Sequence, residues 1–196
     1  MYADFSVELG AEDPTLAVPW ISPDGTQRYY DLKRHPEQLE KVTEAQQSVP
    51  LHEFLISTNS AASIFATAKC DTWATQQMDA EDEIFGATWK WASYIDLFAV
   101  SKKLQASFKG HERLAAKIVK LLKRVPEIPA AAEFVVRRAY FQKDISKADD
   151  LREGFYFTFY LSGYGDDEEE AHKRWMIGPK LVENALLQLS ASEAAR

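Results

Sequence analysis

The feature that most constrains the fold of this chain is a run of alternating side chains from Phe155 to Leu161. Every second residue in the run is large and apolar, and the residues between are Tyr156, Thr158 and Tyr160. Successive side chains of a strand point to opposite faces, so the run predicts a strand with one apolar face. Residues 133–141 alternate in a similar way before a polar loop at 143–150. The two segments therefore predict a long hairpin.

A second pair of alternating segments, residues 63–75 and 87–99, predicts another hairpin. The acidic residues 79–83 between them are expected to form a solvated turn. A register with Asp71 opposite Lys90 places small residues against large ones, as close packing requires. In that register one face carries Ile64, Ala66, Ala68, Cys70 and Thr72 opposite Leu97, Ile95, Ser93, Trp91 and Trp89.

Helix signals surround the two hairpins. Proline at a first helical position predicts helices at 36–47 and 50–58, and Pro179 opens another. Apolar spacing predicts a helical stretch at 104–125 that breaks at Gly110, and a helix at 166–175. Residues 5–9 are expected to form a strand and 15–31 a hairpin, while 190–196 are expected to fray.

This order of elements predicts an α+β fold: an antiparallel sheet of two long hairpins, with helices packed on one face. The sequence of helix, hairpin, helix, hairpin and helix also suggests a duplicated helix–strand–strand unit. We expect residues 1–196 to form a single domain, which includes the amino-terminal strand and hairpin within 1–35.

Composition excludes several classes of function. Hydrophobic residues make up 46% and aromatic residues 12% of the chain, which favours a folded globule over disorder. The net charge of −7 disfavours nucleic acid and anionic membranes as partners, and no apolar run is long enough to span a bilayer. The start of the chain lacks signal-peptide features, and one cysteine permits no internal disulfide, so we expect a cytoplasmic protein.

Familiar metal and cofactor motifs fail at identifiable positions. The two His-Glu pairs lack the second histidine of the HExxH zinc motif, because position 56 is Ile and position 115 is Ala. Gly163 and Gly165 superficially resemble a nucleotide loop, but the acidic residues 166–170 that follow would repel phosphate. Cys70 is expected to be buried and inert. We therefore expect no metal and no cofactor, and no catalytic residue can be assigned.

The polar face of the sheet is the main candidate site. It combines tyrosine and tryptophan, which offer apolar area with one polar end, and basic residues that could hold an anion. We predict a non-catalytic binding or regulatory module for a small, anionic and partly aromatic ligand. The residues assigned to this site are Lys69, Asp71, Trp73, Lys90, Tyr94, Arg138, Tyr140, Tyr156 and Tyr160.

Two other hypotheses remain open. Arg113, Lys117, Lys120 and Arg124 share one face of the helix predicted at 104–125, and this basic stripe could dock an acidic protein. Alternatively, the chain is a hydrolase-type enzyme whose site no motif reveals. A dimer formed through an exposed strand edge is compatible with the sequence.

Overall fold

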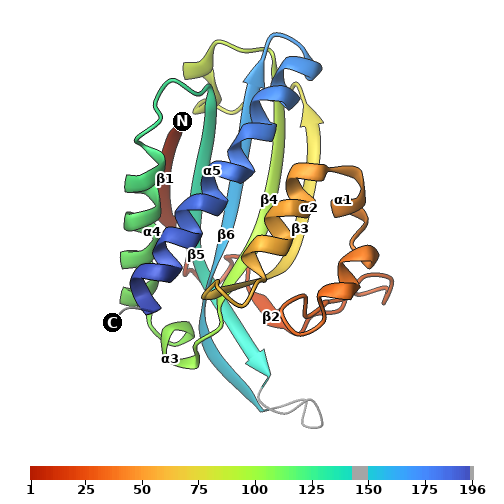
Figure 1. Cartoon of the computed structure of the whole chain (residues 1–196), viewed down its shortest axis with the longest axis vertical. Coiled ribbons are helices and arrows are strands. Elements are labelled where there is room, and N and C mark those ends of the chain that lie inside the picture. The colour runs from red at the N-terminus through yellow and green to blue at the C-terminus, as the bar shows by residue number, and fades with distance from the viewer. Residues whose placement is uncertain (143–149, 195–196) are drawn as a thin grey trace.

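The computed structural model describes residues 1–142 and 150–194 as a mixed six-stranded sheet with helices on one face (Figure 1). The strands pair in the order β1-β5-β6-β4-β3, and β2 pairs with β5. The strands are β1 (Tyr2–Val7), β2 (Leu16–Val18), β3 (Phe65–Thr75), β4 (Trp89–Ala99), β5 (Ala130–Gln142) and β6 (Leu151–Gly165). The helices are η1 (Pro36–Lys41), α1 (Thr43–Gln47), α2 (Val49–Thr58), η2 (Asp82–Phe85), α3 (Lys102–Gln105), α4 (Phe108–Leu122) and α5 (Glu168–Ala194).

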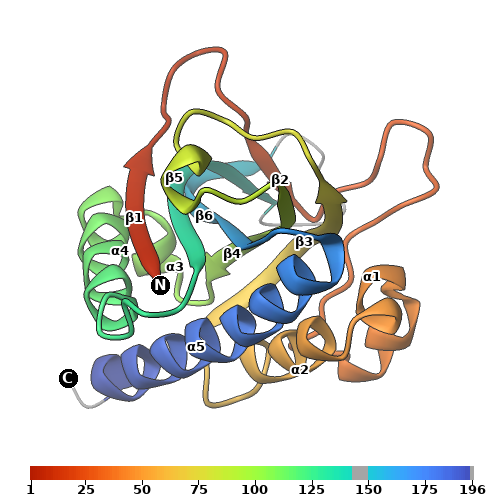
Figure 2. The same cartoon turned by 90° about the horizontal axis from the view of Figure 1, so that it is seen from above.

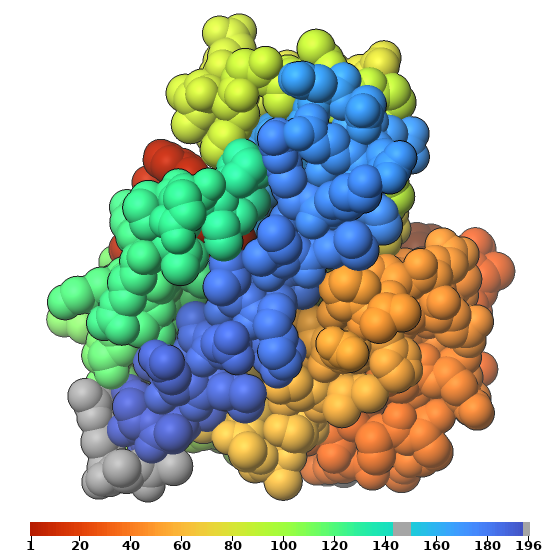
Figure 3. Space-filling view, turned by 45° about the horizontal axis from the view of Figure 1, so that its top comes forward, coloured from red at the N-terminus to blue at the C-terminus, as the bar shows by residue number. Residues whose placement is uncertain are grey.

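The helical layer consists mainly of α2, α4 and α5. Seen from above, these helices lie on one side of the sheet, and η2 and β2 lie on the other (Figure 2). Helix α5 runs as a diagonal ridge between α4 and α2 (Figure 3). The apolar face predicted for β6 packs against this layer, since Phe157, Phe159 and Leu161 are buried with the helix residues. The α+β class and the helix-covered face are thereby confirmed.

The sheet is not purely antiparallel, which corrects the predicted architecture. Strand β1 pairs in parallel with β5, and β2 continues in parallel along the same edge. The hairpin predicted at 15–31 is reduced to a single antiparallel bridge between Ile21 and Arg28. The strand predicted at 5–9 begins earlier, at Tyr2. Strand β1 pairs with a strand that is distant in the sequence, so no local sequence pattern indicates this pairing. By contrast, β3 and β4 are consecutive strands that pair antiparallel, and so are β5 and β6.

The register between β3 and β4 also differs from the predicted one. Asp71 lies opposite Tyr94, and Lys90 lies opposite Thr75. The register shifts between Thr67 and Cys70, where β3 contains one extra residue. This bulge exchanges the two faces of β3. Before it the odd-numbered residues face the helices, so Ala66 leaves the face that it was predicted to share with Cys70.

Helix α5 joins two helices that were predicted to be separate, and Pro179 lies inside it. A proline in a helix interior costs about 3 kcal/mol, because it lacks an N–H and crowds the preceding turn. Burial of Trp175 before the proline and of Val182 after it outweighs that cost, since each buried side chain contributes roughly 1.5–3 kcal/mol. Ser190, expected in a frayed tail, is 1% exposed and its Oγ accepts a hydrogen bond from the backbone N–H of Ile64.

The helical stretch at 104–125 breaks three residues before the predicted glycine. Ser107 caps α4, and its Oγ accepts a hydrogen bond from the backbone N–H of Gly110 at 3.0 Å. A side-chain oxygen at this position satisfies a helix N–H that has no partner within the helix, which explains why the helix starts there. The helix predicted at 36–47 is likewise divided, into η1 and α1.

Two predictions fall wholly or partly outside the described residues. The polar loop predicted at 143–150 lies outside them except for Asp150, and so do residues 195–196 of the predicted tail. The duplication of a helix–strand–strand unit stays a prediction.

Candidate functional site

The face of the sheet that the helices leave uncovered, which we call the open face, differs between its two ends. At one end Leu16 from β2 packs with large side chains of the sheet, and Trp20 and Tyr29 pack against that cluster. The cluster also contains Ala66, Phe98, Ala139, Phe141 and Tyr156. This end is a second, smaller hydrophobic core beneath the segment that contains β2.

The other end of the open face is hollow because the central strands carry small side chains there. One row of cross-strand neighbours crosses five of the six strands: Tyr2, Ala131, Ser162, Ala92 and Trp73, from β1 through β5, β6 and β4 to β3. Only the two outer members are large, and Tyr2 is 52% and Trp73 39% exposed. With strands about 4.8 Å apart, the two aromatic residues stand roughly 19 Å from each other. The row therefore forms a trough with an aromatic residue at each edge.

The link between β3 and β4 closes one end of this trough. Tyr164 donates a hydrogen bond from its hydroxyl to Asp82 at 2.6 Å, and Lys90 pairs with the same carboxylate. Phe85 stacks on Tyr164 with ring centroids 3.9 Å apart. Burial alone would raise the pKa of Asp82, but the hydrogen bonds from Lys90 and Tyr164 lower it on balance. Asp82 is thus a buried anchor, whereas residues 79, 80, 81 and 83 are exposed, so the predicted solvated turn is corrected at Asp82 alone.

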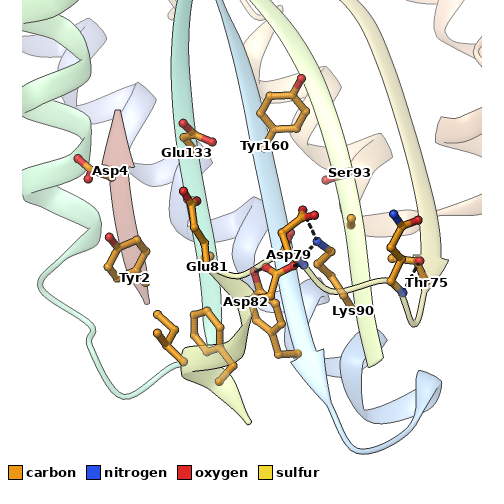
Figure 4. A pocket seen from close by; sticks show the side chains of 18 of the residues that line it. Tyr2, Asp4, Thr75, Asp79, Glu81, Asp82, Lys90, Ser93, Glu133 and Tyr160 are labelled. Carbon is orange, nitrogen blue, oxygen red and sulfur yellow. Dashed lines mark hydrogen bonds and ion pairs between the residues drawn. The ribbon is translucent and has the colours of Figure 1, made fainter. Parts of the chain in front are cut away.

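The trough and the link enclose a groove of about 810 Å³ (Figure 4). This volume lies within the range of small-molecule sites. Its walls come from β1, the 77–85 link and β3, and its floor comes from β4, β5 and β6. The polar and aromatic side chains that line it include Tyr2, Asp4, Ser6, Trp73, Thr75, Gln77, Asp79, Glu81, Asp82, Phe85, Lys90, Glu133, Tyr160, Ser162 and Tyr164.

A buried polar cluster separates the groove from the filled end. Arg137 is 8% exposed; its side chain donates to Glu8 at 2.8 Å and to Thr158 at 2.8 Å. Thr158 in turn donates to Asp96 at 2.9 Å. Arg137 also donates to the hydroxyl of Tyr160 at 3.2 Å, and so connects the cluster to the groove.

Asp96 is the carboxyl group of this cluster with the most altered acidity. Burial raises its pKa to about 6, and the hydrogen bond from Thr158 and the charges of Lys69 and Arg137 only partly offset that effect. Asp96 does not line the groove, however. Its neighbours hold it inside the sheet face, which is the arrangement of a structural group.

The structure brings three of the sequence-predicted residues, Trp73, Lys90 and Tyr160, into the groove. Asp71 and Tyr94 are neighbours in the adjoining row of the open face. Lys69 lies 4.6 Å from the ring centre of Trp20 and, with Tyr94, lines a separate cavity of about 340 Å³. The predicted site is therefore spread over more of the face than one ligand would contact.

The remaining three predicted residues lie elsewhere. Tyr156 is 2% exposed, inside the filled end. Phe134 of β5 packs in the helix-covered core. Arg138 and Tyr140 lie an even number of residues from it in the same strand, so they also point away from the open face. Arg138 instead lies 3.7 Å from Glu153. Arg137 occupies the place on the open face that was assigned to its neighbour.

Sequence reasoning missed Tyr2, Asp4, Glu133 and the anchor Asp82. Tyr2 and Asp4 belong to β1, whose pairing with β5 is parallel and distant in sequence. Glu133 was placed in a strand, but both faces of that strand are rich in apolar residues, so its pattern does not say which face is open. Tyr164 is the cross-strand partner of Lys90, so the proximity of Asp82 to Tyr164 depends on the register between β4 and β6.

The basic stripe is partly neutralised within the chain. Arg113 and Lys117 each contact Glu193 of α5 at 2.9 Å. Lys120 is exposed, but α4 ends at Leu122, so Arg124 lies beyond the helix. Two of the four cations are thus paired within the chain, and docking of an acidic partner stays a prediction.

The glycines that resemble a nucleotide loop have a packing role. A Cβ atom at Gly163 would clash with the backbone of Trp175, and one at Gly165 would clash with Ala171. Absence of side chains at these positions lets α5 lie directly on the end of β6.

Two further searches complete the description of the site. No helix within residues 1–142 and 150–194 combines the length and the apolar character needed to cross a membrane. Across those same residues, His, Cys, Asp and Glu side chains nowhere gather in the groups of three or more that could hold a metal ion.

The class that fold and site define is an α+β protein with a mixed sheet and an aromatic-edged groove on its open face. Comparison with protein-family models, curated proteins and solved structures finds no match for the chain.

Proposed function

We propose that this protein binds a small molecule without covalent chemistry in the groove of the open face. The observation that carries the proposal is the row of small residues between Tyr2 and Trp73. Side chains as small as Ala131, Ser162 and Ala92 on a central sheet leave a hollow, while exposed aromatic edges supply contact area for a ligand.

Exposed apolar groups at the groove support the same proposal. Tyr2, Trp73 and Ile84 are among the large hydrophobic residues that remain exposed, and all three line the groove. Apolar surface that gathers in one place on a protein is typical of a binding site. A ligand that covers these residues would gain the free energy of their removal from water.

A binding role is favoured over catalysis by the position of Asp96, the one carboxyl among the described residues whose pKa is raised. A general acid must reach the reacting atoms, and Asp96 is buried beneath its partners and does not line the groove. The hydrolase alternative therefore lacks an observation in its favour.

The experiment is a thermal-shift screen of small metabolites, with hits confirmed by titration calorimetry. The Ala131→Phe variant would fill the hollow and should abolish binding of any true hit. Ala62→Phe, at an exposed turn position far from the groove in the fold, is the matched control and should bind normally. Equal affinity in both variants, or a screen without any hit that Ala131→Phe removes, would overturn the proposal.

A further inference from the structure

The charges that line the groove have a sign opposite to that expected from the sequence. Among the described residues, five carboxylates line it, those of Asp4, Asp79, Glu81, Asp82 and Glu133, and one lysine, Lys90. Arg138, which favoured an anionic ligand in the sequence analysis, points to the other face. The groove therefore presents an excess of negative charge.

Lys90 is already neutralised by partners within the groove. Its Nζ pairs with Asp82 and lies 3.7 Å from Asp79, and its side chain is 13% exposed. Figure 4 shows these three side chains on one side of the groove. A ligand anion would have to displace an existing ion pair to reach this lysine, and it would meet like charges on the way.

The other three carboxylates make no ion pair with any described residue of the protein. Glu133 accepts one hydrogen bond, from Ser6 Oγ to Oε1 at 2.7 Å, and Asp4 accepts one from the backbone N–H of Phe5 at 2.8 Å. Asp4 and Glu133 are direct cross-strand neighbours, and Glu81 faces them from the link (Figure 4). Like charges placed side by side repel each other, so a cation between them would be favourable.

Aromatic rings complete the surroundings that an organic cation prefers. Tyr2 is two residues from Asp4 in β1, and Tyr160 is the cross-strand neighbour of Glu133, although the guanidinium of Arg137 already lies 5.6 Å from the centre of its ring. The faces of Tyr and Trp rings attract ammonium groups electrostatically. The cavity of about 810 Å³ leaves room for an apolar body attached to the charged group.

We propose that the ligand of the groove is a small organic cation, an amine or quaternary ammonium group joined to an aromatic or aliphatic body. The ammonium group lies at Asp4, Glu81 and Glu133, and the body lies along the hollow row toward Trp73. This inference rests on the proposed function of the groove and specifies the class of its ligand.

The test uses three probes with the same phenyl body and different head groups: 2-phenylethylamine, 2-phenylethanol and 3-phenylpropionate. Their dissociation constants are measured by chemical-shift titration of the ¹⁵N-labelled protein, with the indole N–H of Trp73 assigned through a Trp73→Phe variant. The amine should bind roughly tenfold more tightly than the alcohol, which corresponds to one favourable charge interaction. The propionate should bind most weakly.

Variants then locate the charge. Glu133→Gln keeps an oxygen for the hydrogen bond from Ser6 and should weaken amine binding several-fold without changing the affinity for the alcohol. Glu81→Gln changes a residue of the exposed link, so it tests the same effect on amine binding without altering the sheet. Glu169→Gln, an exposed carboxylate of α5 paired only with Lys173, is the control and should change nothing.

The outcomes separate the ligand class from the proposed function. Preference for the alcohol or the propionate, with shifts at Trp73, would overturn the cation inference and leave the groove as a binding site. Amine binding that falls equally in Glu133→Gln and Glu169→Gln would also overturn it. Absence of shifts at Trp73 with every probe, together with a metabolite screen that yields no groove-dependent hit, would end both proposals.

Discussion

The two ends of the open face are made from the same strands but have opposite properties. At one end β4, β5 and β6 contribute Phe98, Phe141 and Tyr156, which pack under Leu16 into a buried cluster. At the other end the same strands contribute Ala92, Ala131 and Ser162, and the face is hollow. Strand pairing is continuous from one end to the other, so the volume of the side chains distinguishes the packed end of the sheet from the hollow end.

The largest effect is expected from emptying the filled end. Phe98→Ala removes a side chain that is 7% exposed and packs on Tyr29 and Phe141. The unfolding free energy should fall by about 3–5 kcal/mol, because the cavity cannot collapse between paired strands. Urea denaturation followed by far-UV circular dichroism measures it. A loss under about 1 kcal/mol would mean that the segment over this end contributes little to the fold.

The second-largest effect on the unfolding free energy is expected at Asp96, which lies between the two ends. Its folded pKa of about 6 exceeds the value near 4 of an unfolded carboxyl, so the folded chain retains a proton that the unfolded chain loses. Stability from this group is complete below pH 4 and is lost as the pH rises toward and through 6. Asp96→Asn cannot ionise and should be more stable than the native protein at pH 7, by roughly 3 kcal/mol.

Urea unfolding at a series of pH values from 4 to 7 measures this difference. The two proteins should have similar stability at pH 4 and diverge above it. Asp71→Asn, an exposed carboxyl on the same face, should keep the pH dependence of the native protein. If Asp96→Asn kept that dependence as well, Asp96 would already be ionised without cost in the fold.

The smallest effect is expected from filling the hollow end. Ala131→Phe adds a ring over open space, so the unfolding free energy should change by less than about 1 kcal/mol even though ligand binding is abolished. Differential scanning calorimetry without ligand measures it. A loss comparable to that of Phe98→Ala would show that the two ends are packed alike, and the contrast between them would disappear.

The sequence predicts where the strands of this protein lie better than it predicts how they pair. Alternating residues predict β3, β4, β5 and β6, and the predicted segments agree with the observed strands within a few residues. The extra residue between Thr67 and Cys70 was not found, because small apolar residues occupy both faces of β3 there. One undetected residue is enough to exchange the faces of a strand.

The same limit explains the partial prediction of the site. Trp73 and Tyr160 were predicted for the polar face of the sheet, and both line the groove on the open face. Arg137 and Arg138 are adjacent, and only the pairing of β5 with β6 decides which of them faces the groove side. Asp4 could not be foreseen as a partner of Glu133, since nothing local marks a parallel contact between distant segments.

That distant pairing has a consequence for how the site forms during synthesis. Ser6 and Glu133, which join one wall of the groove to its floor, are 127 residues apart in the sequence. Contacts of such separation form slowly, because the chain loses much freedom before it gains them. The segment that is translated early must wait for β5 before it can pair, so a nascent chain has no groove until most of the sheet is complete. The proposed affinity for a ligand would thereby be acquired late, when the sheet is complete.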